Sequence, residues 1–215
     1  MKKLILLSLL SFIGMSAWAQ LRPDFIMYAG YQTSMQPKLA NALMHHGYQI
    51  GVGADFRVYQ NNLLNLSVRP GVRFSGKGTR IQPTLTNTPE APATTSNTNN
   101  TGARTTNLNF VEVPVLVNAN FDLADNLKVY ANAGPYLGLF VGGNQLTNAP
   151  KATSQKIAMS NTNYNKFEAG INIGAGIEFS RVLMGVDTSC NLTNYTKAQQ
   201  PSQLISFAFN VGYRF

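Results

Sequence analysis

Apolar and polar residues alternate at every second position along most of the chain, and no other feature constrains the fold as strongly. Successive side chains of a β-strand point to opposite faces of a sheet, so this pattern predicts strands with one apolar and one polar face. Helical periodicity is almost absent, and we therefore predict an all-β chain. The final segment shows the alternation most clearly, because small or polar residues separate Ile205, Phe207, Phe209, Val211, Tyr213 and Phe215.

Eight segments carry this pattern and are the predicted strands: 24–34, 47–59, 63–78, 105–121, 126–143, 164–180, 182–195 and 203–215. Short polar turns follow the second, fourth and sixth segments. Long connections follow the other segments, over 35–46, 79–104, 144–163 and 196–202. Short turns on one side and long connections on the other predict an up-and-down antiparallel meander.

The charged residues of these segments share one face, and the apolar face contains no Asp, Glu, Lys or Arg. The polar face is also rich in glycine, as a crowded interior requires. Its acidic residues are Asp55, Glu112, Glu168, Glu178 and Asp187, and its basic residues are Arg57, Arg69, Arg73, Lys77, Lys128, Lys166 and Arg214.

The surroundings of the apolar face decide the class of protein. In a soluble sandwich or a lipocalin, apolar side chains fill the interior and charges face water. An outer-membrane barrel has the reverse arrangement. The apolar stretches are long enough to cross a bilayer when tilted, and hydrocarbon offers no hydrogen-bonding partner to a free sheet edge. We therefore predict a closed eight-stranded antiparallel up-and-down transmembrane β-barrel.

The start of the chain differs in kind from the rest. Two lysines precede an apolar run of ten residues, and the small residues Ala17 and Ala19 stand before Gln20. This pattern is typical of a secretory signal peptide, and its apolar run is too short to span a bilayer. Gln20 in place of a cysteine excludes lipoprotein processing at this site. We expect 1–19 to be the signal peptide and 20–215 to be the barrel domain, exported to the bacterial outer membrane.

Composition excludes several other classes. No apolar run of membrane-spanning length follows the signal peptide, which excludes a helical membrane protein. The single cysteine, Cys190, excludes a disulfide-stapled domain, and we expect it to face lipid as a small apolar side chain. The formal net charge of +8 would suit nucleic acid, but the basic residues are dispersed along an exported chain. We therefore predict no nucleic-acid partner.

Short motifs follow one another in order along the third to eighth predicted strands. They are Arg69-Pro70-Gly71 with Lys77-Gly78, Glu112-Val113-Pro114-Val115-Leu116, Gly134-Pro135-Tyr136, Gly174-Ala175-Gly176-Ile177-Glu178, Leu192-Thr193-Asn194 and Gly212-Tyr213-Arg214-Phe215. With these motifs the chain resembles the PorT-type outer-membrane β-barrel proteins of Bacteroidetes, a porin-like family of small barrels. The resemblance implies a C-terminal strand that the barrel assembly machinery reads, here through Phe207, Phe209, Val211, Tyr213 and Phe215. It also implies a role beside a protein-secretion machine.

The charges of the polar face form the largest group of chemically active side chains. An eight-stranded barrel is just wide enough for side chains to fill, and buried charges are costly unless they pair. We predict a salt-bridged plug, and a proton or ion path along the same residues is the alternative. The predicted network comprises Asp55, Arg57, Arg69, Arg73, Glu112, Lys128, Glu168, Glu178, Asp187 and Arg214.

Catalytic groups are scarce. His45 and His46 fall in the first long connection, where neighbouring side chains of an extended segment point apart and form a poor metal site. We expect solvated histidines, no metal or other cofactor, and no enzymatic activity. The Thr/Asn-rich segment 79–104 is predicted to be a mobile extracellular loop. The connection 144–163 carries lysines that we expect to contact lipopolysaccharide phosphates.

The sequence thus predicts an outer-membrane barrel with a plugged polar interior and a non-enzymatic structural or accessory role. Two alternatives remain open. One is a small passive pore, and the other is a surface adhesin or enzyme that acts through the extracellular loops.

Overall fold

The computed structural model describes residues 23–37, 42–61, 63–82, 103–148, 152–160, 163–197 and 202–215. The predicted signal peptide, with Ala17, Ala19 and Gln20 around its cleavage site, lies outside the described residues. No helix in the described ranges is long and apolar enough to cross a membrane. The strands are β1 (Asp24–Met35), β2 (Ala42–Leu43), β3 (His45–Gln60), β4 (Leu64–Ile81), β5 (Ala103–Ala124), β6 (Leu127–Asn148), β7 (Ala152–Ile157), β8 (Phe167–Phe179), β9 (Val182–Asn191) and β10 (Ile205–Arg214).

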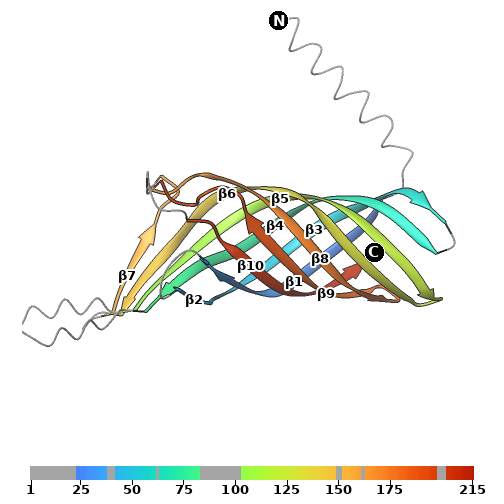
Figure 1. Ribbon diagram of the computed structural model, residues 1–215, viewed down its shortest axis with the longest axis horizontal. Coiled ribbons are helices and arrows are strands. Elements are labelled where there is room, and N and C mark those ends of the chain that lie inside the picture. Colours follow the sequence, from blue (N-terminus) through green and yellow to red (C-terminus); the bar gives the residue numbers. More distant parts are fainter. Residues whose placement is uncertain are drawn as a thin grey trace, which may run out of the picture.

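Eight of these strands form a closed ring of antiparallel neighbours (Figure 1). The ring follows the order β1-β3-β4-β5-β6-β8-β9-β10, and it closes where Ile26 of β1 pairs with Arg214 of β10. The short strands β2 and β7 pair with β4 and β6. The predicted eight-stranded up-and-down barrel is therefore confirmed.

The outer face of the ring is apolar and exposed. Phe167, Val58 and Leu137 leave 73%, 69% and 67% of their surface uncovered. The intervening positions point into the ring, where Asp55 and Glu112 are buried. Large exposed apolar side chains outside and buried charges inside are what a barrel surrounded by hydrocarbon requires.

The two ends of the barrel differ (Figure 1). At one end, the turn end, the hairpins β3–β4, β5–β6 and β8–β9 are joined by two or three residues. The opposite end, the loop end, carries the long connections together with β2 and β7. The C-terminus lies at the turn end, because Arg214 follows the β10 positions that pair with the start of β9.

The predicted loop over 79–104 is too long at both of its ends. Thr79 to Ile81 belong to β4 and pair with Thr106 to Arg104 of β5. Polar, threonine-rich residues form strands here because the hairpin extends past the apolar band, and threonine suits a pleated surface. The remaining residues, 83–102, lie outside the described part of the chain.

Glycines allow close approach inside the ring at one level. Gly176 of β8 and Gly185 of β9 are paired directly, and a Cβ atom on either would overlap the hydroxyl of Tyr130. These two glycines therefore make room for an inward-pointing tyrosine. A third glycine, Gly142, has a φ of 138° where the register of β6 shifts by one residue against β5. That backbone conformation favours glycine and forms a β-bulge.

Candidate functional site

The interior holds two groups of paired charges at different depths. The turn-end cluster consists of Asp24, Asp55, Arg57, Arg69, Glu178 and Arg214. The central cluster, nearer the middle of the barrel, consists of Arg73, Lys77, Glu112 and Glu168. In both clusters the ion pairs join side chains from different strands, so the closed ring positions them.

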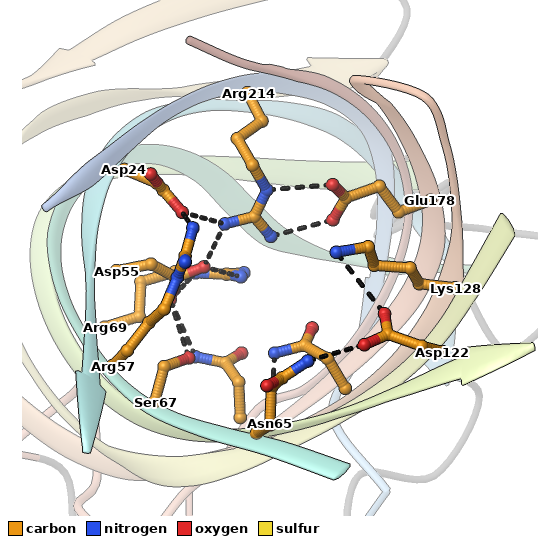
Figure 2. Close-up of polar contacts among 12 residues, drawn as sticks. Asp24, Asp55, Arg57, Asn65, Ser67, Arg69, Asp122, Lys128, Glu178 and Arg214 are labelled. Carbon is orange, nitrogen blue, oxygen red and sulfur yellow. Dashed lines mark hydrogen bonds and ion pairs between the residues drawn. The ribbon is translucent and has the colours of Figure 1, made fainter. Parts of the chain in front are cut away.

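Arg214, in the last strand, organises the turn-end cluster (Figure 2). Its Nε and Nη2 atoms donate to the two carboxylate oxygens of Glu178 at 2.9 and 2.7 Å, and its Nη1 atom donates to Asp55 at 2.8 Å. Arg69 makes a second two-point contact with Asp55, at 2.9 and 2.7 Å. Asp55 thus lies between two guanidinium groups. Two-point contacts of this kind are strong and fix side-chain orientation.

One ion pair of the turn-end cluster and a separate pair lie at the rim of this end, where water reaches them. Arg57 donates to Asp24 at 2.6 Å, and Lys128 lies 3.3 Å from Asp122. Figure 2 shows both pairs beside the Arg214 contacts. Sequence reasoning placed Arg57 and Lys128 in the interior but missed Asp24 and Asp122. Asp24 and Asp122 occupy the same alternate positions as the inward-pointing residues of β1 and β5. The alternation of the sequence would therefore have assigned both of them to the interior.

The central cluster is screened from solvent. The Lys77 and Glu112 side chains are completely buried, and the Lys77 Nζ atom lies 2.7 Å from Glu112 and 2.9 Å from Glu168. Arg73 donates through Nε to the other oxygen of Glu112 at 2.7 Å. Each carboxylate therefore has a basic partner, which buried charges require.

Neutral side chains complete the central cluster. Lys77 donates to the Tyr136 hydroxyl at 3.3 Å and reaches Asn191 of β9 at 3.5 Å. Asn191 in turn donates to Glu168 at 2.5 Å. Since β4 and β9 lie on opposite sides of the ring, Lys77 crosses the full width of the lumen.

A small cavity of about 40 Å³ separates the two clusters. Arg69 and Arg73 line it from opposite clusters, together with Asp187. Asp187 was predicted to belong to the charge network. Within the described residues it forms no ion pair, and it accepts a hydrogen bond from Asn210 instead. A volume of this size holds a few water molecules.

An apolar group lies in the loop-end half of the interior, and it was not predicted from the sequence. We call this group the apolar plug; its buried members are Leu108, Phe110, Phe140, Ile157, Tyr195 and Leu204. Tyr164 packs against the plug by stacking on Phe140, with ring centroids 5.7 Å apart. The plug adjoins the central cluster, because the Lys77 Nζ atom lies 5.7 Å from the centroid of the Phe110 ring. Phe110 lies two residues before Glu112 and so points to the same, inward face of β5. The alternation could therefore have predicted that it is inside.

Two predictions about single residues were wrong. Lys166 was assigned to the interior but precedes β8 and is exposed. His45 was expected to be solvated, but it begins β3, is buried and hydrogen-bonds to Asn107. His46 is exposed and contacts the Tyr31 hydroxyl. Cys190 is exposed on the outer face, where it was predicted to lie.

The C-terminal strand β10 presents its alternating apolar side chains outward. It pairs with β9 on one side and β1 on the other, so it completes the ring. The exposed residues are those predicted to form the assembly signal, Phe207, Phe209, Val211, Tyr213 and Phe215.

Comparison with known proteins places the chain in a family. The sequence matches the family described as outer membrane protein beta-barrel domain over residues 16–197. None of the curated proteins matches the chain.

Several solved structures of outer-membrane proteins are similar to the chain. Ail, the attachment invasion locus protein of Yersinia pestis, is 14% identical, with a TM-score of 0.38 over 91% of this chain and 100% of Ail. The outer membrane enzyme PagL is 13% identical, with a TM-score of 0.47 over 88% of this chain and 98% of PagL. Neisserial surface protein A is 13% identical, with a TM-score of 0.42 over 89% of this chain and 97% of that protein. Because the family match covers most of the sequence and the structure is an inside-out barrel, the chain belongs to the outer membrane protein β-barrel family and lies in the bacterial outer membrane.

Proposed function

We propose that the protein is a closed, non-conducting barrel with a structural or accessory role in the outer membrane. The observation that carries this proposal is the contact of Lys77 across the whole lumen, from β4 to Glu168 of β8 and Asn191 of β9. An ion that moved along the axis would have to separate Lys77 from its carboxylate partners. Leaving one member of such a buried pair without its partner costs about 3–5 kcal/mol.

The apolar plug supports the same proposal independently. It lies between the central cluster and the extracellular end, since long loops of such barrels face outward. A hydrated ion would lose water against Leu108, Phe110 and Phe140, and these side chains offer no polar replacement. The two barriers therefore act in series and disfavour the passive pore.

Conductance in planar bilayers tests the closed lumen. The refolded protein is expected to give currents near background. Truncating the plug with Phe110→Ala and Phe140→Ala is expected to add brief openings, whereas Phe209→Ala, a matched change on the outer face, is not. Steady openings of the unmodified protein would contradict the proposal and favour the pore.

The accessory role is further proposed to be linked to protein secretion, and its support is the set of PorT-like motifs. Several of these motifs supply interior residues, such as Arg69, Glu112 and Glu178. A deletion strain tests the link by proteomics of exported proteins. We expect some of them to accumulate in the periplasm. Correct placement of every exported protein in that strain would count against a secretion role.

The outward aromatic residues of β10 support recognition by the barrel assembly machinery, and Phe215→Ala is expected to slow assembly in pulse-chase experiments.

The contacts of the two histidines support a role without catalysis. His45 contacts Asn107 and His46 contacts Tyr31, and no carboxylate of the described chain bonds to either histidine.

A further inference from the structure

A large pocket lies at the extracellular mouth, on the outer side of the apolar plug. It has a volume of about 520 Å³ and opens between β7 and the segments around Tyr164 and Thr196. This size falls within the range of pockets that hold small ligands. The polar side chains that matter here are Arg104, Gln145, Gln155, Lys156, Tyr164 and Lys197.

The charges of this pocket are all of one sign. Arg104, Lys156 and Lys197 contribute three cations, and none of the described carboxylates lines the pocket. Among the described residues, none of these three cations forms an ion pair, whereas Arg73 and Lys77 of the interior each have a carboxylate partner. Arg104, Lys156 and Lys197 are all exposed, and the pocket therefore presents positive charge that attracts an anion from solution.

The donors of the pocket are held in place by structure that lies beneath them. Arg104 donates through Nη2 to Gln145, which fixes the guanidinium plane on the β5–β6 hairpin. Lys156 pairs with Asn144 in the β6–β7 ladder, and the next residue, Ile157, is anchored in the apolar plug. The backbone of the site is therefore in place before a ligand binds, and binding orders mainly the exposed Lys156 and Lys197 side chains.

Tyr164 adds a neutral donor. Its ring is stacked between Phe140 and Tyr195, with centroids 5.7 and 6.5 Å away. Burial raises the pKa of the Tyr164 hydroxyl, so the group keeps its proton at neutral pH. The peptide N–H of Lys197 donates to Asn163 at 3.1 Å, which holds the facing wall in position.

We propose that this pocket binds a polyanion of phosphate or sulfate groups, such as a phosphorylated or sulfated saccharide. Arg104 offers the planar fork that matches the oxygens of a phosphate, and Lys156 and Lys197 supply point charges beside it. The same chemistry is available from the headgroup of a surface lipid or from a soluble molecule. The site is independent of the closed lumen, because it lies outside the plug.

Titration with inorganic tripolyphosphate tests the proposal. The refolded protein, in an uncharged detergent, is studied by isothermal titration calorimetry. We expect saturable binding that weakens about tenfold in each of the variants Arg104→Gln, Lys156→Gln and Lys197→Gln. Arg80→Gln is the matched control, because Arg80 is an exposed cation at the same end that does not line the pocket. It is expected to change affinity less than twofold.

Failure to bind tripolyphosphate would overturn the proposal, and so would equal weakening in Arg80→Gln and the pocket variants, which would indicate only a diffuse positive surface. Cold-SDS gel migration verifies that each variant is folded. Three separate pocket variants keep the test intact if one of them fails to fold.

The source of the anion is distinguished by repeating the titration in nanodiscs. If the pocket holds lipid headgroups, adding phosphatidic acid to a neutral bilayer will lower tripolyphosphate affinity more in the unmodified protein than in Arg104→Gln. If the ligand is soluble, the anionic bilayer will repel tripolyphosphate equally in both proteins, and the ratio of their affinities will not change. Either result supports binding of the polyanion in the pocket.

Discussion

The central and turn-end clusters use the same kinds of side chain but meet different amounts of water. In the central cluster the Lys77 and Glu112 side chains expose none of their surface. In the turn-end cluster Asp55 and Glu178 are also buried, but their partner Arg214 exposes 15%, and Arg57 at the rim exposes 54%. Contact distances are similar, since Arg57 and Asp24 are 2.6 Å apart and Lys77 and Glu112 are 2.7 Å apart.

This difference shows that the distance between two charges does not measure their importance. An exposed pair exchanges contacts with water at little cost, whereas a buried charge that loses its partner has no replacement. When one charge of a pair is removed, we therefore expect the loss in the free energy of unfolding to depend more on the depth of that charge in the barrel than on its distance from the partner. The following variants test this expectation.

The largest effect is expected for Glu112→Ala. This change leaves Arg73 and Lys77 buried without their shared carboxylate, and we expect a loss of about 3–5 kcal/mol in the free energy of unfolding. Urea unfolding in detergent micelles measures it. Asp122→Ala, which removes a carboxylate at the exposed rim, is the control and should cost much less. Similar losses in both variants would show that the centre of the barrel is as wet as its rim.

A double-mutant cycle measures how strongly the central charges depend on one another. Lys77→Met leaves Glu168 without its basic partner, and Glu168→Gln removes one of the two carboxylates that contact Lys77. The double variant removes both members of the pair. We expect the double variant to be more stable than the sum of the single effects by about 1–3 kcal/mol. Additive losses in urea unfolding would mean that Lys77 and Glu168 do not interact.

Arg214→Gln is expected to have an intermediate effect. It removes the two-point contact with Glu178, but Asp55 keeps Arg69 as its partner. Hydrogen bonds to charged groups contribute about 1.5–3 kcal/mol, and the loss of the partner of Glu178, whose side chain exposes only 3%, places this variant at the upper end. The same urea series measures it. A loss as large as that of Glu112→Ala would contradict the dependence on depth.

The smallest effect is expected for Arg57→Gln at the rim. Exposed pairs contribute about 0.2–1 kcal/mol, and salt screens them. The difference from the unmodified protein should therefore disappear when urea unfolding is repeated in 0.5 M NaCl. The loss caused by Glu112→Ala should persist at that salt concentration. If salt removed both differences, the two clusters would be equally hydrated.

Much of the fold could be predicted because alternation specifies which side of a strand each residue occupies. A charge such as Glu112 cannot face hydrocarbon, so its position assigns the inward face of the whole segment. The same alternation places Asp24 and Phe110 inside. Asp24 was missed because it precedes the clearest part of the pattern in its strand. Phe110 was missed because it is an apolar residue on a face that is otherwise mostly polar.

The pairing of charges could not be predicted in the same way. Alternation fixes the face of a residue but not the register between strands, and only register decides that Arg73 meets Glu112. Strand ends are also weakly specified outside the apolar band. For this reason Thr79 was assigned to a loop and Lys166 to a strand.

The length of the β5–β6 hairpin has a consequence for how the surface of the protein can vary. Each strand contains 22 residues, and at about 3.4 Å per residue such a strand is roughly 70 Å long. The apolar band of these barrels is only about 25 Å tall, so much of both strands stands in water even when they are tilted. At the loop end, where Ala103 pairs with Asn148, the two strands extend beyond this band. Insertions in the connections that leave this end are therefore expected to alter what the cell displays while the embedded wall keeps its stability.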